Sequence, residues 1–108
     1  MSVLLVHCTC PDDAVARRIA RSLVEHRLAA CVNVGAPVFS VYRWDGAVQD
    51  TTEVPLVIKT TSERFDEMKV HLLMLHPYEL PEILAVEPAA GLDRYLDWIG
   101  TATQPPSE

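Results

Sequence analysis

The sequence has few glycines and few basic residues, and both shortages exclude functions. Only 4 of the 108 residues are glycine, which leaves little material for a loop that cradles nucleotide phosphates. Lys and Arg total 9 against 15 Asp and Glu, a formal net charge of −6. Nucleic acids are bound by basic faces, and anionic membranes attract basic segments. We therefore expect neither a nucleic acid nor a membrane among the partners.

Long apolar segments are also missing. No run approaches the roughly 18 residues of a membrane-spanning helix. The apolar stretch near the start covers only residues 3–6, and no Lys or Arg precedes it. A signal peptide needs a basic region and a longer apolar segment, so we expect this stretch to be a strand of the mature fold. Cytoplasm is the predicted compartment.

Disulfide frameworks and catalytic motifs are missing as well. Cys8, Cys10 and Cys31 are an odd number of cysteines without regular spacing, which favours free thiols in a reducing compartment. The chain has no Gly-x-Ser-x-Gly and no His-Glu-x-x-His motif. A nucleophile pair of Cys8 and His76 would require the two side chains to touch. We expect that the protein is not an enzyme.

What the sequence does contain is a clear succession of hydrophobic patterns. They predict strands over residues 2–9, 29–44, 47–60 and 83–86, and helices over residues 12–26, 62–75 and 92–99, with a break at residues 35–37. Asp45-Gly46 favours a two-residue hairpin turn. Pro55 predicts an edge, a bulge or an unpaired amide in its strand. Thr60 or Ser62 is expected to cap the second helix, and Thr60 with Glu63 fits a capping box.

This order predicts one α+β domain. It is β-α-β-β-α-β plus a C-terminal helix, the ferredoxin-like plan of an antiparallel sheet with two helices on one face. We place the domain at residues 1–102 and expect a disordered, polar tail over residues 103–108. The first strand is apolar on both faces, and the hairpin is long for so small a domain. Both features predict a homo-oligomer, with Tyr42, Trp44 and Trp98 at the interface.

Two groups of residues are candidate binding sites. Lys59, Glu53, Tyr78 and Glu82 combine a lysine, two carboxylates and a phenol. They could bind a small polar ligand or ion in a cleft between subunits, or form an ion-pair network that fixes the connector at residues 76–83. Cys8 and Cys10 could present sulfur to a metal ion or fill space in the core; His7 alternates to the opposite face. His76 could be a metal ligand or a helix cap.

Six motifs carry a resemblance to a known family. In chain order they are CTCPD, AACVNV, SVYRWDG, EVPLVIKTT, HPYELPEI and YLDWI, and the match covers residues 3 to about 100. The sequence resembles the CutA family of divalent-cation tolerance proteins. The resemblance implies a ferredoxin-like fold, a tight homotrimer with a shape similar to that of the PII signalling proteins, and a link to copper and other divalent cations.

Carried over position by position, the resemblance implies metal ligation by Cys8 and His76. Some members have a second histidine directly before the latter, where this chain has Leu75. We therefore expect a trimeric divalent-cation tolerance protein that binds copper, as Cu(I) or Cu(II), or another divalent cation, and that needs no metal to fold. The alternative is a PII-like regulatory module that binds a small ligand in inter-subunit clefts and signals to an unidentified protein partner. A third is a rigid trimeric scaffold with incidental metal contact.

Overall fold

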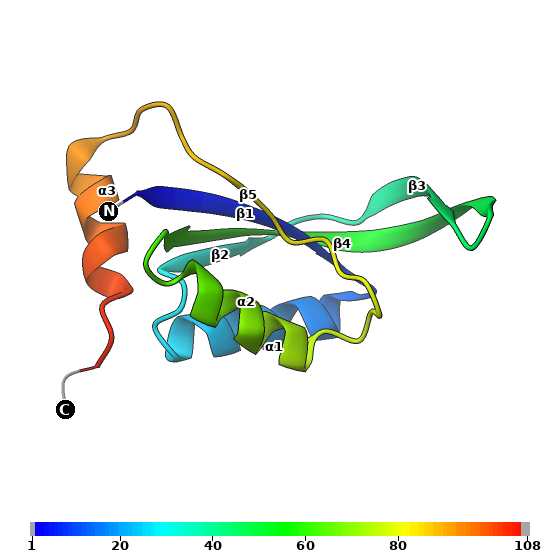
Figure 1. Cartoon of the computed structure of the whole chain (residues 1–108), viewed down its shortest axis with the longest axis horizontal. Helices are drawn as coiled ribbons and strands as arrows, with labels where there is room; N and C mark the ends of the chain where they lie inside the picture. The colour runs from blue at the N-terminus through cyan, green and yellow to red at the C-terminus, as the bar shows by residue number, and fades with distance from the viewer. Residues whose placement is uncertain (1, 107–108) are drawn as a thin grey trace.

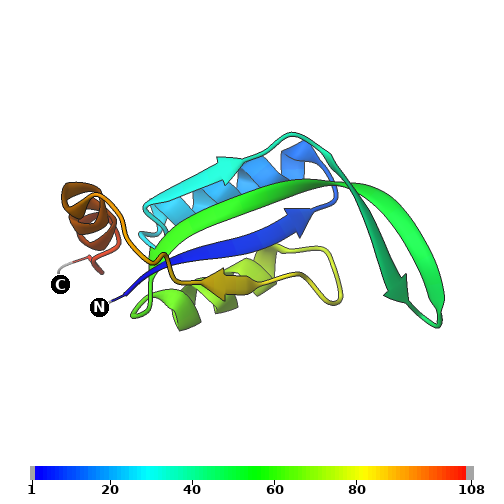
Figure 2. The same ribbon diagram turned by 90° about the horizontal axis from the view of Figure 1, so that it is seen from above.

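The computed structural model describes residues 2–106 and has the predicted α+β, ferredoxin-like architecture (Figure 1). The elements are β1 (Val3–Cys10), α1 (Asp13–Glu25), β2 (Cys31–Val34), β3 (Val38–Trp44), β4 (Ala47–Thr61), α2 (Phe65–Leu75), β5 (Leu84–Val86) and α3 (Asp93–Ala102). The antiparallel sheet has the strand order β2-β4-β1-β5, and β3 pairs with the remaining length of β4. Helices α1 and α2 lie on one face of the sheet, while α3 stands at one end (Figures 1 and 2).

Strand β4 is the longest element and serves two purposes. Its C-terminal half lies between β1 and β2, and its N-terminal half pairs with β3. Pro55 lies where the partner changes, because β2 ends opposite Leu56 and β3 begins opposite Glu53. The carbonyl of Pro55 accepts the N–H of Gly35 at 2.9 Å. Because the nitrogen and the carbonyl of one strand residue point to the same side, the Pro55 nitrogen, which has no hydrogen to donate, faces the gap between β2 and β3. The prediction of an unpaired amide is confirmed.

The hairpin of β3 and β4 projects beyond the rest of the sheet (Figure 2). Asp45 and Gly46 form its turn with φ of 55° and 77°, the left-handed values that a two-residue hairpin of this kind requires. The chain has a radius of gyration of 14.5 Å, against about 13 Å for a compact domain of this length. One chain alone therefore leaves most of the hairpin exposed.

Helix α1 is positioned by both of its ends. The carboxylate of Asp12 caps the first turn by accepting the N–H of Val15 at 2.8 Å. After His26 the backbone of Arg27 adopts a left-handed φ of 58°, and the N–H of Leu28 returns to the carbonyl of Leu23 at 2.9 Å. The helix buries Ala16, Ile19 and Leu23 against the sheet.

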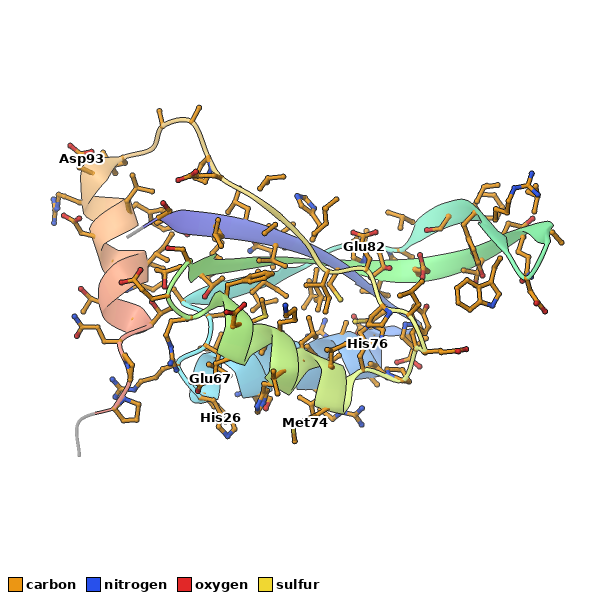
Figure 3. The ribbon with its side chains drawn as sticks, in the orientation of Figure 1. His26, Glu67, Met74, His76, Glu82 and Asp93 are labelled. Atoms are coloured by element: carbon orange, nitrogen blue, oxygen red, sulfur yellow. The ribbon has the colours of Figure 1, made fainter. Side chains whose placement is uncertain are left out.

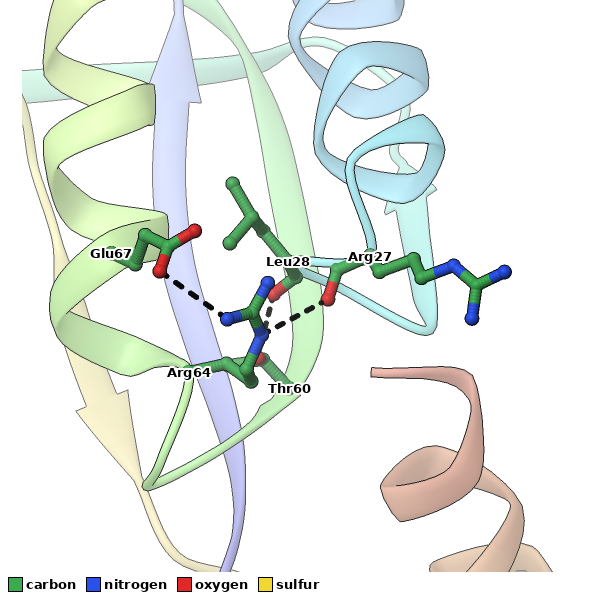
Figure 4. A network of polar contacts seen from close by, with 5 residues as sticks. All are labelled: Arg27, Leu28, Thr60, Arg64 and Glu67. Carbon is green, nitrogen blue, oxygen red and sulfur yellow. Dashed lines mark hydrogen bonds and ion pairs between the residues drawn. The ribbon is translucent and has the colours of Figure 1, made fainter. Parts of the chain in front are cut away.

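The start of α2 differs from the prediction. Thr60 and Thr61 still belong to β4, and the N-cap residue of α2 is Arg64, whose side chain makes no capping bond. The hydroxyl of Thr60 instead donates to the carbonyl oxygen of Leu28 at 2.7 Å (Figure 4). The predicted caps at Thr60 and Ser62, and the capping box with Glu63, are therefore wrong, because β4 extends further and uses the Thr60 hydroxyl to hold the segment after α1.

The two faces of the sheet differ in how the chain covers them. Val6, Cys8 and Cys10 of β1 are buried under the helices, while Leu5 on the other face is only half-buried. At the far end of the chain, Thr103 is buried and donates to the carbonyls of Ile99 and Gly100, although it is the first residue of the predicted disordered tail. Residues 107–108 of that prediction lie outside the described residues. No helix within residues 2–106 is long and apolar enough to cross a membrane.

Candidate metal centre

Two cysteines and one histidine meet at the end of β1. Cys8 and Cys10 alternate onto the helix-covered face of the strand, with 1% and 0% of their surface exposed, and His76 is the buried C-cap residue of α2. One ligand atom from each of the three lies within 4.8 Å of the other two. The structure thus brings the predicted pair Cys8 and His76 together. Cys10 was not in that pair, although the two-residue period of a strand places it beside Cys8; His7 faces the other way, as predicted, and is exposed.

The imidazole of His76 already has two hydrogen-bond partners. Its Nε2 lies 2.8 Å from the carbonyl oxygen of Thr9, and its Nδ1 lies 3.1 Å from the backbone nitrogen of Tyr78. A carbonyl only accepts and a backbone N–H only donates, so this network assigns the proton to Nε2 and the lone pair to Nδ1. A metal ion can gain this imidazole as a ligand only when one of these contacts is released.

The two thiols differ in acidity. The hydrogen bond with Cys10, followed by burial, raises the pKa of Cys8 far above its ordinary value, whereas the same hydrogen bond lowers the pKa of Cys10. Cys10 is therefore the sulfur that carries negative charge first. The carboxylates of Glu82, Asp12 and Glu53 are close enough to raise the thiol pKa values by charge repulsion. The same surroundings attract a cation.

The donor set fits a thiophilic metal ion. Two sulfurs and one imidazole are ligands typical of Zn²⁺ and, for the thiolates, of Cu(I). The cysteines are free, and a disulfide between residues two apart on one strand is disfavoured, because their Cα atoms lie about 6.6–6.8 Å apart, at the upper limit for that bond. Binding would require loss of thiol protons and the release of one His76 contact.

The predicted cleft residues are only partly together. The hydroxyl of Tyr78 donates to Oε1 of the buried Glu53 at 2.9 Å. Lys59 lies six residues further along β4, roughly 20 Å away, where its Nζ donates to the Tyr95 hydroxyl at 3.2 Å. Glu82 is exposed on the connector, where Figure 3 labels it, and its charge helps to raise the pKa of Cys8. Within one chain Lys59 does not join the others, so a cleft that contains all four across subunits stays a prediction.

The connector at residues 76–83 is held at two points. His76 joins it to β1 through Thr9, and Tyr78 joins it to β4 through Glu53. The rings of His76 and Tyr78 also contact each other, with centroids 4.7 Å apart. These contacts support the interpretation that the polar residues fix the connector, although a phenol–carboxylate bond takes the place of the predicted ion pair.

The residues predicted for the subunit interface lie on the surface of the single chain. Tyr42 and Trp44 are each 40% exposed on β3, and Trp98 is 45% exposed on α3. Phe39, Val41 and Val48, on the same hairpin as the first two, are more than half exposed. An apolar surface of this kind is available for a protein contact, and its role in a trimer stays a prediction.

Comparison with known proteins gives a consistent result. The family described as CutA1 divalent ion tolerance protein matches residues 4–102. The chain is 47% identical over 95 residues to the divalent-cation tolerance protein CutA of Thermus thermophilus, covering 88% of this chain and 92% of that one. It is 42% identical over 99 residues to a CutA homolog of Xenopus laevis, covering 92% of this chain but 66% of that longer relative. The crystal structure of CutA from Xylella fastidiosa superposes with a TM-score of 0.93 at 43% identity, covering 96% of this chain and all of that one.

Proposed function

Since this chain belongs to the CutA1 divalent ion tolerance family, we propose that it contributes to divalent-cation tolerance by binding copper or another thiophilic metal ion at Cys8, Cys10 and His76. The observation that carries the proposal is the convergence of their ligand atoms within 4.8 Å. All three side chains are buried, which excludes water from most of the site and strengthens charge interactions there.

Each of the three residues has a distinct part in this proposal. Cys10 supplies the first thiolate, because the hydrogen bond from Cys8 lowers its pKa. Cys8 supplies the second when the metal displaces its proton. His76 supplies a nitrogen and remains tied to the protein through whichever of its two contacts is kept, an outer hydrogen bond that fixes the ring. Cys10 thereby adds a third donor to the pair, Cys8 and His76, that the sequence resemblance implies.

We further propose that the protein acts as a homotrimer in the cytoplasm and without a catalytic step. The half-exposed second face of β1 and the exposed apolar residues of the hairpin support assembly. The free cysteines support a reducing compartment. Metal binding by side chains needs no chemical conversion of a substrate.

The test is a calorimetric titration of the reduced, metal-free protein with Cu(I), Cu(II) and Zn²⁺ under anaerobic conditions. We expect Cu(I) or Zn²⁺ to bind with a Kd below about 1 μM, a binding free energy stronger than about −8 kcal/mol. Cys8→Ser and Cys10→Ser should each weaken this binding at least about tenfold. His76→Gln should weaken it less, because its ring must first give up a hydrogen bond.

Cys31→Ser is the matched control. Cys31 is a free cysteine on β2 outside the group of three, and its removal should leave the affinity unchanged. Equal binding by the native protein and by both Cys8→Ser and Cys10→Ser would contradict the proposal. If a small ligand instead bound without metal, and Lys59→Ala or Glu82→Ala abolished that binding, the PII-like regulatory alternative would be supported.

A further inference from the structure

A pair of histidines on the helix side of the molecule has no part in the site described above. His26 is the C-cap residue of α1 and His71 lies in α2. Their ring centroids are 4.6 Å apart and the rings are tilted by 46°. Figure 3 shows His26 near Glu67 on the lower, helix-covered side, apart from His76. Two neighbouring imidazoles can bind one metal ion when each has a ring nitrogen with a free lone pair.

One residue orients both rings. The carbonyl oxygen of Ser22 accepts from Nδ1 of His26 at 2.8 Å, and the hydroxyl of Ser22 lies 2.8 Å from Nε2 of His71. Because a carbonyl cannot donate, His26 carries its proton on Nδ1 and has a free lone pair on Nε2. When the Ser22 hydroxyl accepts from His71, the free lone pair of that ring is on Nδ1. Hydrogen bonds of this kind to the far nitrogen are the usual outer support of histidine ligands.

The rings are close enough for one ion to hold both. A Zn–N bond is about 2.0–2.1 Å long, so two imidazoles on one tetrahedral ion have centroids roughly 5 Å apart. The observed separation of the His26 and His71 centroids, 4.6 Å, is close to that value.

The same pocket offers a carboxylate. His26, His71, Glu67 and Met74 line one open pocket with a volume of about 380 Å³. Glu67 precedes His71 by one turn of α2, so both project on the same side of the helix. Its Oε1 lies 3.3 Å from Nη1 of Arg64, and Nε of that arginine donates to the carbonyl of Arg27 (Figure 4). Among the described residues, a carboxylate oxygen of Glu67 and one nitrogen from each ring do not all lie within 4.8 Å of one another. The Glu67 side chain is 68% exposed, however, and can rotate toward the rings.

We propose that His26 and His71, completed by Glu67 and water, form a second divalent-cation site on the helix side of the protein. Its nitrogen and oxygen donors suit Zn²⁺, Cu²⁺ or Ni²⁺, whereas the sulfur donors of the buried site suit softer ions. The buried Arg64 beside it keeps its bond to Arg27 and opposes the bound charge, so this site is the weaker of the two. The proposal does not depend on metal binding at Cys8, Cys10 or His76.

The experiment is a Zn²⁺ titration of the reduced, full-length protein, followed by NMR of the histidine ring nitrogens. These signals distinguish the four histidines and the two nitrogens of each ring. We expect Nε2 of His26 and Nδ1 of His71 to shift together and to saturate with one ion per chain at this site, in addition to the ion taken by the tighter buried site. His26→Gln should abolish the shift of His71, and Ser22→Ala should weaken binding about tenfold or more, since it removes an outer hydrogen bond.

His7→Gln provides the matched control, because His7 is an exposed histidine on the other face of the sheet. It should leave the His26 and His71 shifts intact. His26 is exposed, so His26→Gln should leave the fold intact. The proposal is overturned if Zn²⁺ moves neither ring, or if His71 still saturates at the same Zn²⁺ concentration in His26→Gln. Shifts at His76 alone would support only the buried site.

Discussion

Nε2 of His76 donates to the carbonyl oxygen of Thr9 at 2.8 Å, and this bond joins the end of α2 to the strand that carries both cysteines. Thr9 lies between Cys8 and Cys10, so the histidine is placed beside the sulfurs by a contact that is itself structural. The same imidazole accepts the N–H of Tyr78 at 3.1 Å. His76 therefore stabilises the connector even when no metal is present.

The first prediction concerns the stability of the metal-free protein. His76→Leu removes the donor to Thr9 and the acceptor for Tyr78, so it should lower the free energy of unfolding by about 1–3 kcal/mol. Urea unfolding followed by far-UV circular dichroism measures this change. His7→Leu, at an exposed position of the same strand, should change stability by less than about 0.5 kcal/mol. Equal stability of the native protein and His76→Leu would show that these two bonds contribute nothing.

Local patterns were sufficient to predict the fold. The hydrophobic period, the Asp45-Gly46 turn and the position of Pro55 each depend on neighbouring residues, and the structure confirms all three. The caps at Thr60 and Ser62 were wrong for a different reason. The Thr60 hydroxyl has a partner 32 residues away in the sequence, the carbonyl of Leu28, and a single local pattern contains no information about such a contact.

The candidate site was predictable in part for the same reason. Strand alternation places Cys8 and Cys10 together, but the arrival of His76 depends on how α2 packs on the sheet. Lys59 was grouped with Tyr78 because both lie near the ends of predicted elements. In the structure Lys59 and Glu53 are six residues apart along β4 and have different partners, Tyr95 for Lys59 and Tyr78 for Glu53.

The second prediction tests the bond between Thr60 and Leu28. Thr60→Val keeps the shape of the side chain but leaves the buried Leu28 carbonyl without its donor, so unfolding should become easier by about 1–3 kcal/mol. Thr52→Val is the control, because Thr52 is an exposed residue of the same strand. Its effect should stay within about 0.5 kcal/mol. Chemical denaturation of both variants measures the difference, and equal midpoints for the two would contradict the assigned role of Thr60.

The third prediction concerns pH. Burial and the hydrogen bond to Glu53 raise the pKa of Tyr78 above its ordinary value. The folded protein therefore holds this proton more tightly than the unfolded chain, and the resulting stability is fully present below the unfolded pKa of about 10. It should decrease as the pH rises above that value and be lost through the higher folded pKa. Unfolding free energies measured from pH 8 upward test this dependence.

Two variants separate Tyr78 from other groups that titrate at high pH. Tyr78→Phe should remove its share of the pH dependence, and Glu53→Gln should reduce that share by removing the carboxylate. Tyr95→Phe is the control, because Tyr95 is a 40% exposed tyrosine of α3 and is not among the groups that raise the pKa of Tyr78. If Tyr78→Phe had the same slope of stability against pH as the native protein, the raised pKa of Tyr78 would be contradicted.

The last prediction tests assembly through the hairpin. Light scattering should give a mass three times the 12.0 kDa of the chain. Trp44→Asp places a charge on the exposed apolar surface that we assign to the interface, and burying an unpaired carboxylate there is costly, so the variant should dissociate at micromolar concentration. Val24→Asp is the matched control: Val24 is 41% exposed on α1 and Trp44 is 40% exposed on β3, but only the latter lies on the hairpin. A native protein that scatters as a monomer, or dissociation caused equally by both changes, would contradict a trimer held together by this hairpin.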